Sequence, residues 1–544
     1  MSFLKHSIRA ALALSAAAAG IHSASANDIS TYNSSVVNVY LSGSTAIDGT
    51  LLNAAIATVA PTGLCAAGTV DVYYIGTPSS YTNRMIFCNA SSGVTSSAGT
   101  LAAGTPIAIF KESNVGSVNG VVPLYLTAEG TANGLSFINP ASITDTNCAT
   151  TATVAATTKL GAYTNHSGCP VTATTTANPT AGFADVEAAI LRTPTNGGVD
   201  AASAAKYLSS VGTLDQIWTV LLTKNAYYAL QAAEGYTSPS DSPANAPSLS
   251  REQVASLLSG TSIVSWSQLG VTSPVDDNVY LCRRDFGSGT EASFESEYFG
   301  QRCSALATEN IPQEDGQFVF AAGSGGGVRS CLQAFFAGGS ITPYYTPGTT
   351  NPAPAGSNSP VAEPGSQFAI GINNAEITAG NLSGAADSFR AIAIDGSGPT
   401  VPNVQNGVYP YFSTGVSYQI KTGAGVPSGN PKLVSSALLA KLGHPAFTAV
   451  SNSGYNGVVP WNGTVTGAGS LATGDASPAG LYLSSNHLSS VPSTSAIAAS
   501  NPTNMFTKSL SGTVNNCDTP VFDSADQPHT TPESKVLGNT AVND

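Results

Sequence analysis

Charged side chains are scarce in this chain of 544 residues, since Asp, Glu, Lys and Arg together make up only 9% of it. Most of them are acidic, with 32 Asp and Glu against 19 Lys and Arg, and the formal net charge is −13 at pH 7. Nucleic-acid binding needs basic side chains to neutralise phosphates, so we expect no nucleic-acid partner. A small anion is not excluded, because a buried site acts through local hydrogen bonds and a single arginine.

The sequence also lacks an apolar run of the roughly 18 to 20 residues that a membrane helix requires. Residues 1–26 instead have the pattern of a secretory signal peptide, with Lys5 and Arg9 near the start, an Ala- and Leu-rich stretch and the small residues Ala24-Ser25-Ala26 at the end. We therefore expect an exported protein, periplasmic or extracellular, that is not inserted in the membrane after signal cleavage.

No two of the eight cysteines have the Cys-x-x-Cys spacing of zinc sites, and the histidines are scattered. An even number of cysteines in an exported protein indicates disulfide bonds, and we predict neither a metal nor a cofactor. Cys65 with Cys88 and Cys148 with Cys169 are expected as local pairs. Four more cysteines would form two bonds whose connectivity the sequence leaves open, namely Cys282, Cys303, Cys331 and Cys517.

Two common signatures of hydrolytic enzymes are missing, the Gly-x-Ser-x-Gly elbow and the His-Glu-x-x-His helix. The candidate serines described below have no histidine near them in the sequence. We therefore expect a protein that is not an enzyme. An enzyme stays an alternative, which a histidine distant in sequence but close in space, such as His444, would support.

What the sequence does contain is a turn suited to binding an oxyanion. Arg283-Arg284 precedes Gly287-Ser288-Gly289-Thr290, between an apolar strand pattern at 279–281 and a helical pattern that places Phe294 and Tyr298 on one face. Ser288 is a favourable N-cap, so the turn leads into a helix N-terminus, where amide groups without intrahelical partners and the helix dipole favour negative charge. The arginines and hydroxyls add charged and neutral hydrogen-bond donors.

Chance is the alternative explanation of this turn, because the chain contains 55 glycines. Gly-Ser-Gly indeed occurs again at 323–325 and 396–398. Neither repeat combines a preceding pair of arginines with a following helix, which favours the turn at 283–290 as the anion site.

Strand and helix patterns occur on both sides of this turn and indicate an α/β fold. The cleanest helix begins after Ser250, with Gln253 at the capping-box position and Gly260 closing it. The segment of about 127–180 loses periodicity and is interpreted as an insertion. The other patterns predict a helix at 224–233 and strands at 36–41, 107–110, 217–222, 368–372 and 389–394.

In their order, these pieces resemble the phosphate-binding proteins of bacterial ABC transporters, which belong to the type 2 periplasmic binding proteins. The block at 283–290 is similar to that family's anion loop, and Gly43-Ser44-Thr45-Ala46 is similar to its N-terminal turn. Residues 249–266 are similar to its helix and tryptophan turn. The C-terminal part of the resemblance consists of Ile370-Gly371, Asp395-Gly396, Pro399-Thr400, Asn403 and 407–410.

The resemblance implies eight ligand-binding positions, of which the first four in the chain belong to one lobe and the other four to the second. One is a serine of the segment 113–117, with Ser117 preferred, and another is Asp185, which would accept the proton of a protonated phosphate. The chain has Ala46 where the family often has an aromatic residue. The eight positions are Thr45, Ala46, Ser117, Asp185, Arg284, Ser288, Gly289 and Thr290.

The resemblance also implies a two-lobed α/β fold with loop insertions. Residues 27–213 and 395–500 would build one lobe, 214–394 the other, and 501–544 a polar C-terminal tail. The expected ligand is phosphate or a related oxyanion, and the expected partner is an ABC transporter permease. The alternative is a secreted or surface protein that keeps this fold without transport, as the insertions and the low charge suggest.

Overall fold

The structure is a computed structural model that describes residues 28–448 apart from gaps, the longest of which are 192–198, 304–316, 342–360 and 376–386. Beyond residue 448 it describes 465–466, 470–471, 482–484 and 504–522, the last without 505 and 509–513. The expected signal peptide at 1–26 lies outside the described residues. Within them, no helix is both long enough and apolar enough to cross a bilayer.

A mixed sheet of fourteen strands dominates the part of the chain that the structure describes, which confirms the α/β expectation. Two of its strands, β19 (Phe389–Ala391) and β24 (Tyr482–Ser484), pair with the long strand β12. The others follow one another from edge to edge as β15 (Gln317–Ala322), β14 (Val279–Arg284), β18 (Ala369–Asn374), β12 (Leu208–Thr223), β21 (Phe412–Ile420), β11 (Ala181–Ala184), β1 (Val37–Gly43), β6 (Pro106–Glu112), β3 (Ser80–Asn89), β2 (Asp71–Thr77), β9 (Tyr163–Ser167) and β8 (Thr150–Val154).

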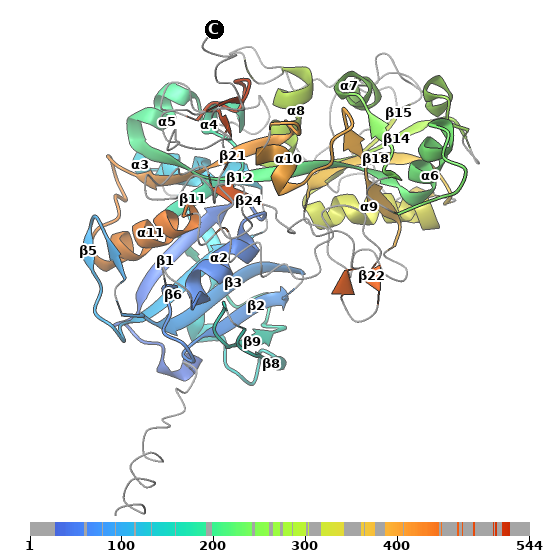
Figure 1. Ribbon diagram of the computed structural model, residues 1–544. Helices are drawn as coiled ribbons and strands as arrows, with labels where there is room; N and C mark the ends of the chain where they lie inside the picture. Colours follow the sequence, from blue (N-terminus) through green and yellow to red (C-terminus); the bar gives the residue numbers. More distant parts are fainter. Residues whose placement is uncertain are drawn as a thin grey trace, which may run out of the picture.

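The strands gather into two lobes, one around β1, β6 and β3 and the other around β14, β15 and β18 (Figure 1). In the first lobe β1 is parallel to both β6 and β11, and in the second β14 is parallel to both β15 and β18. Strand β12 belongs to both, because residues 208–217 pair with β21 and residues 218–222 pair with β18. A β-bulge between Gly212 and Leu214 lies beside the predicted boundary at 213/214. The lobe boundaries themselves remain a prediction.

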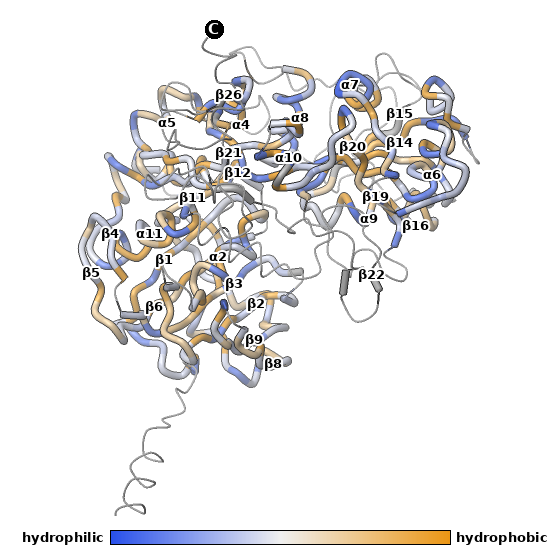
Figure 2. The backbone as a smooth tube through the Cα atoms, in the orientation of Figure 1, coloured by the Kyte–Doolittle hydropathy of each residue, from blue (hydrophilic) through white to orange (hydrophobic). Residues whose placement is uncertain are grey.

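Helices pack against the sheet in both lobes. In the first lobe α11 contacts α2 and β1, and in the second α9 contacts β14, β15 and β18. Hydrophobic residues concentrate in the strands under these helices, for example β14 and β19 (Figure 2). The helices are α2 (Asp48–Ile56), α3 (Val122–Ala128), α4 (Ala188–Leu191), α5 (Ala201–Tyr207), α6 (Lys224–Ala233), α7 (Arg251–Ser259), α8 (Gly289–Phe299), α9 (Gly325–Ala337), α10 (Val401–Gln405) and α11 (Gly429–Leu442).

Local sequence patterns located several elements closely. The helix expected at 224–233 is α6 with the same bounds. At the start of α7, Ser250 Oγ accepts a hydrogen bond from the Gln253 amide at 3.1 Å, and Gln253 Oε1 accepts one from the Ser250 amide at 2.8 Å. This confirms the predicted capping box. Gly260, the expected end of that helix, lies outside the described residues.

The segment read as an insertion contains regular structure that its sequence did not indicate. Strands β7 (Leu135–Ile138) and β10 (Thr174–Ala177) pair with each other, and β8 and β9 extend the large sheet at its edge. Most of β8 is exposed and rich in threonine. It therefore lacks the alternation of apolar and polar residues by which a half-buried strand is recognised. The other short pairs are β4 (Thr95–Ser96) with β5 (Gly99–Thr100), β13 (Ser248–Leu249) with β20 (Ala393–Ile394), β16 (Gly339–Ile341) with β17 (Val361–Glu363), β22 (Val465–Thr466) with β23 (Ser470–Leu471), and β25 (Phe506–Thr507) with β26 (Val521–Phe522).

All eight cysteines form disulfide bonds, as expected. The two local pairs, Cys65–Cys88 and Cys148–Cys169, are confirmed. The structure also settles the connectivity that the sequence left open. Cys282 of β14 is bonded to Cys331 of α9, and Cys303 is bonded to Cys517 across 214 positions of sequence.

The end of β1 is packed so closely that only glycine fits. Gly43 has a φ of +100°, and a Cβ added there would lie 2.0 Å from the Phe183 carbonyl oxygen and 2.6 Å from Gly120 Cα. Both contacts are with backbone atoms, which cannot move aside cheaply. This close approach fixes the turn that follows β1, which carries part of the candidate site.

Gly43→Ala should therefore destabilise the protein by about 3 kcal/mol or more, because it combines backbone strain with a clash inside a packed sheet. Urea unfolding followed by circular dichroism measures this change. Gly104→Ala is the matched control, since Gly104 also has a positive φ, +80°, but no atom lies within 4 Å of its added Cβ. It should cost only about 1 kcal/mol. Equal losses in the two variants would contradict the packing explanation.

Candidate functional site

Three loops of the first lobe lie side by side at the carboxyl ends of the sheet strands. Strands β11, β1 and β6 are adjacent and parallel, so the turns after their carboxyl ends lie side by side. These turns hold Ser44 to Ala46 after β1, Ser117 after β6 and Asp185 after β11. The first-lobe residues predicted from the sequence are therefore neighbours, although 140 positions separate Thr45 from Asp185.

The predicted anion loop of the second lobe packs directly against these loops. Ser288 caps α8, and Gly289 is the first residue of the helix. A Cβ added to Gly289 would lie 2.4 Å from Ser117 Oγ and 2.6 Å from Asp185 Cβ. The Val118 amide donates a hydrogen bond to the Gly287 carbonyl at 3.1 Å. The N-terminus of α8 is thus in van der Waals contact with the two first-lobe residues that the resemblance pairs with it.

Asp185 is the most constrained residue of the cluster. Its side chain is buried, Ser44 Oγ donates a hydrogen bond to Oδ1, and its amide donates to Ser117 Oγ at 3.0 Å. Its carbonyl accepts from Ser413 Oγ at 2.8 Å, and that hydroxyl accepts from the indole of the buried Trp218. Asp185 is therefore held through its side chain and its backbone by Ser44 and Ser117, from the turns after β1 and β6, and by Ser413 of β21.

Burial raises the pKa of Asp185 above its ordinary value. Hydrogen bonds from Ser44 and Ser117 act in the opposite direction, as do the positive charges of Arg284 and Lys111. Without these four groups the ionised carboxylate would be still less favourable. The ionised form of the buried Asp185 carboxylate, which is a hydrogen-bond acceptor, therefore depends on these polar neighbours.

Arg284 lies at the end of β14 beside the anion loop and is buried. Its Nε donates to the Ala322 carbonyl at 3.1 Å and its Nη2 to the Gly323 carbonyl at 3.0 Å, while Nη1 donates to Thr290 Oγ1 at 3.4 Å. The guanidinium is thus anchored to the turn before α9, and these contacts fix its orientation toward Thr290.

The other arginine of the pair has a different environment. Arg283 forms buried ion pairs with Glu291 and Glu295, both on α8. Glu291 also accepts a hydrogen bond from the Arg284 amide at 3.1 Å. Arg283 thus ties β14 to α8 and is balanced by two carboxylates. The positive charge of Arg284, by contrast, lowers the pKa of Asp185.

Two residues of the cluster were missed in the sequence. Ser44 makes the contact with Asp185, while Thr45 and Ala46, which are expected to bind the ligand, are half-buried in the turn before α2. Lys111 is almost completely buried at the end of β6, where its Nζ donates to the Gly43 carbonyl at 3.0 Å and lies 3.3 Å from Asp48 Oδ1. A lysine directly after the apolar run 107–110 was the available signal for it.

Metal-ligating side chains do not gather in the described part of the chain. No three His, Cys, Asp or Glu side chains there come close enough to hold an ion. The groups that the cluster does assemble are hydroxyls, helix amides, an arginine, a lysine and one carboxylate, which are suited to hydrogen bonding with an oxyanion that carries a proton.

The sequence matches no protein-family model and no curated protein. The fold is distantly similar to that of solved structures 12% identical in sequence. One is a Clostridium perfringens protein with bound phosphate, described as a phosphate ABC transporter substrate-binding protein, with 77% of this chain and 98% of that one covered at a TM-score of 0.34. Another is an ABC-type phosphate transport receptor from Vibrio cholerae, with 71% and 88% covered at a TM-score of 0.30. Such distant likeness assigns neither a family nor a ligand to this chain.

Ser44→Ala should raise the pKa of Asp185 further, because it removes a hydrogen bond to the ionised carboxylate. A carboxyl group whose folded pKa is raised costs stability once it ionises. The variant should therefore lose stability relative to the unmutated protein as the pH rises from the unfolded-state pKa of this carboxyl toward its raised folded-state pKa. Carbon-13 NMR titration of the Asp185 carboxyl measures the shift directly. Thr45→Ala is the control and should leave the pKa of Asp185 unchanged. A lowered pKa of Asp185 in Ser44→Ala would contradict the assigned hydrogen bond.

Proposed function

We propose that this protein is an exported solute-binding protein that binds phosphate or a related oxyanion between its two lobes and delivers it to an ABC transporter. The observation that carries the proposal is the contact of Gly289, at the N-terminus of α8, with Ser117 and Asp185 of the first lobe. It joins helix amides, hydroxyls and a carboxylate from segments far apart in the sequence.

The chemistry of these groups supports an anionic ligand. Amides at a helix N-terminus lack intrahelical acceptors and bind anions without any net positive charge on the protein. Ser44, Ser117, Ser288 and Thr290 add hydroxyls, and Arg284 adds a positive charge that is held in place by Ala322 and Gly323. The eight positions expected from the sequence would supply the ligand contacts.

The carboxylate of Asp185 supports a ligand that carries a proton. An ionised carboxylate repels a fully deprotonated anion but accepts a hydrogen bond from hydrogen phosphate. Sulfate has no proton at neutral pH, so it would place its oxygens against those of Asp185. The proposed ligand is therefore phosphate in preference to sulfate.

A secreted or surface protein that keeps this fold without transport is the second candidate. The Cys303–Cys517 bond favours it, because Cys303 follows the second-lobe helix α8 while Asn516, beside Cys517, contacts Thr414 and Glu187. The disulfide bond on one side and these hydrogen bonds on the other together restrict the opening through which a transport protein releases its ligand. Binding of neither phosphate nor sulfate would support this candidate.

Isothermal titration with inorganic phosphate tests the proposal directly. The unmutated protein should bind, and Arg284→Ala should weaken binding at least about 100-fold, because charge-assisted hydrogen bonds contribute roughly 1.5 to 3 kcal/mol each. Some stability should also be lost, since the Ala322 and Gly323 carbonyls lose their donor. Lys224→Met is the matched loss of a positive charge, because Lys224 pairs with Asp387 on the second lobe. It should bind normally, and normal binding by Arg284→Ala would show that the anion loop is misassigned.

The unmutated protein should also prefer phosphate over sulfate by at least about 100-fold, if the unmet contact costs roughly 3 kcal/mol. Asp185→Asn should reduce the difference between the affinities for phosphate and sulfate, since an amide can turn its NH₂ toward either anion. Protonation of Asp185 should have the same effect, so sulfate affinity should rise as pH falls toward the raised pKa of this residue. In Asp185→Asn that pH dependence should disappear. Equal affinities for the two anions at neutral pH in the unmutated protein would exclude this role for Asp185.

A further inference from the structure

The described residues of the segment 504–522 form what we call the C-terminal strap. Its strands β25 and β26 pair antiparallel, and the Asn515 amide donates to the Lys508 carbonyl at 2.8 Å. Asn504, Lys508 and Asn516 are buried although all three are polar. A tail that buries polar side chains needs specific partners for them.

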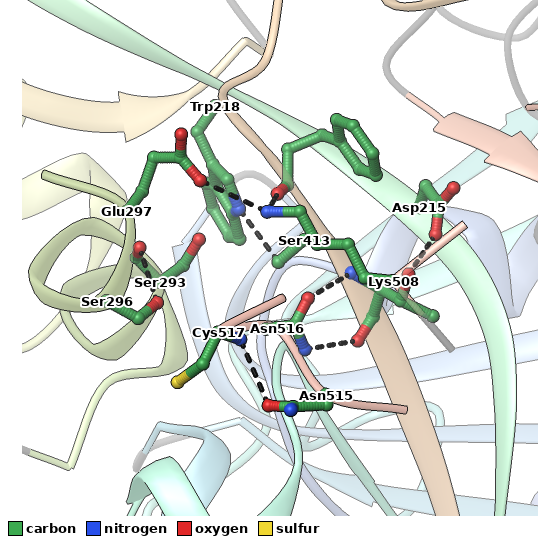
Figure 3. Close-up of polar contacts among 12 residues, drawn as sticks. Asp215, Trp218, Ser293, Ser296, Glu297, Ser413, Lys508, Asn515, Asn516 and Cys517 are labelled. Carbon is green, nitrogen blue, oxygen red and sulfur yellow. Dashed lines mark hydrogen bonds and ion pairs between the residues drawn. The ribbon is translucent and has the colours of Figure 1, made fainter. Parts of the chain in front are cut away.

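One set of partners lies on α8, the helix that begins at the anion loop. Lys508 Nζ donates to Glu297 Oε2 at 3.1 Å and to the Phe412 carbonyl at 3.0 Å, and both side chains of this ion pair are at least nine-tenths buried (Figure 3). Cys517 is bonded to Cys303, which follows the end of α8 at Phe299. The strap is therefore fixed to the second-lobe half of the candidate site.

The other set of partners lies on the first lobe and on the strands between the lobes. Asn516 Nδ2 donates to Glu187 Oε2 at 2.6 Å. It also donates to the Thr414 carbonyl at 3.1 Å, and Asn516 Oδ1 accepts from the Thr414 amide at 2.8 Å (Figure 3). The Asn516 amide side chain thus bonds both backbone groups of Thr414, as a neighbouring strand would. Asn504 donates to Asp215 of β12.

These two sets of contacts bind the strap to the two elements that carry the candidate site, α8 and the link between β11 and α4. Glu297 and Gly289 belong to the same helix, α8. Glu187 is two residues from Asp185, in the short link between β11 and α4. A movement that separated Gly289 from Asp185 would have to displace α8 from the 185–187 link, and the strap is bonded to both.

We propose that Lys508 and Asn516 are positioning residues for the anion site, and that the C-terminal strap holds its two halves together. The strap touches none of the eight proposed ligand positions in the contacts described above, so it acts through α8 and through Glu187. As far as the ligand is concerned, this inference rests on the proposed function. The mechanical part, holding α8 against the 185–187 link, does not.

Hydrogen exchange on the full-length protein without added phosphate tests the mechanical part. The probes are the peptides that contain the Val118 amide, which bonds Gly287, and the first turn of α8. In the Cys303→Ser/Cys517→Ser/Lys508→Met variant these peptides should exchange about tenfold faster or more, because the two halves separate more often. Lys508→Met and Asn516→Ala alone should show smaller increases. Glu297 keeps its pairing with Arg251 in Lys508→Met, so no carboxylate is stranded.

Matched controls separate positioning from general stabilisation. Cys65→Ser/Cys88→Ser removes a disulfide of the first lobe, and Lys224→Met removes an ion pair of the second. Neither should alter exchange at Val118 or at the first turn of α8. Unchanged exchange at these sites in the strap variants would overturn the proposal. An equal increase throughout β1, β6 and β14 would overturn it too, since the strap would then be a general stabiliser.

Inorganic phosphate supplies the second readout. Its dissociation rate should increase about tenfold in the Cys303→Ser/Cys517→Ser/Lys508→Met variant and less in Lys508→Met alone, with little change in its association rate, because the strap holds a site already formed. Faster exchange together with unchanged phosphate dissociation would overturn the link between strap and ligand. Faster exchange in a protein that binds no phosphate would keep the mechanical role and reject the proposed function instead.

Discussion

The contact between the Asp185 carboxylate and the N-terminus of α8 is the interaction on which the arrangement of the two lobes depends. A buried carboxylate is unfavourable unless donors and positive charge surround it. The first lobe supplies Ser44 and Ser117, and the second supplies Arg284 and the end of the helix. Neither lobe alone completes the environment of this group.

The packing around this contact explains why the turns that carry it are so constrained. Gly43, Gly120 and Gly182 lie where backbones approach within a distance that no Cβ allows. Trp218, buried where β12 passes from β21 to β18, donates to Ser413, whose hydroxyl donates to the Asp185 carbonyl. The buried Trp218 thus sets the position of the Asp185 backbone through Ser413.

Buried ion pairs also join different segments of the chain. With so few charged residues, several of those present are buried in pairs, such as Arg283 with Glu291 and Lys508 with Glu297. A buried charge is unfavourable away from its partners, so these pairs specify which segments meet. Two of the segments they join, α8 and the C-terminal strap, both lie at the junction of the lobes.

The sequence by itself determined what short-range interactions decide. The capping box at Ser250, helix α6, the strand before Arg284 and the two local disulfides depend on residues close together in the chain, as does the turn that caps α8 at Ser288. Tertiary structure alone decided the pairing of Cys303 with Cys517, the contact of Ser44 with Asp185, the burial of Lys111 beside Gly43, the anchoring of Arg284 to the turn before α9, and the addition of β8 and β9 to the sheet. Each of these depends on segments that are distant in sequence and come together only when the strands stack in their final order, and local periodicity carries no information about that order.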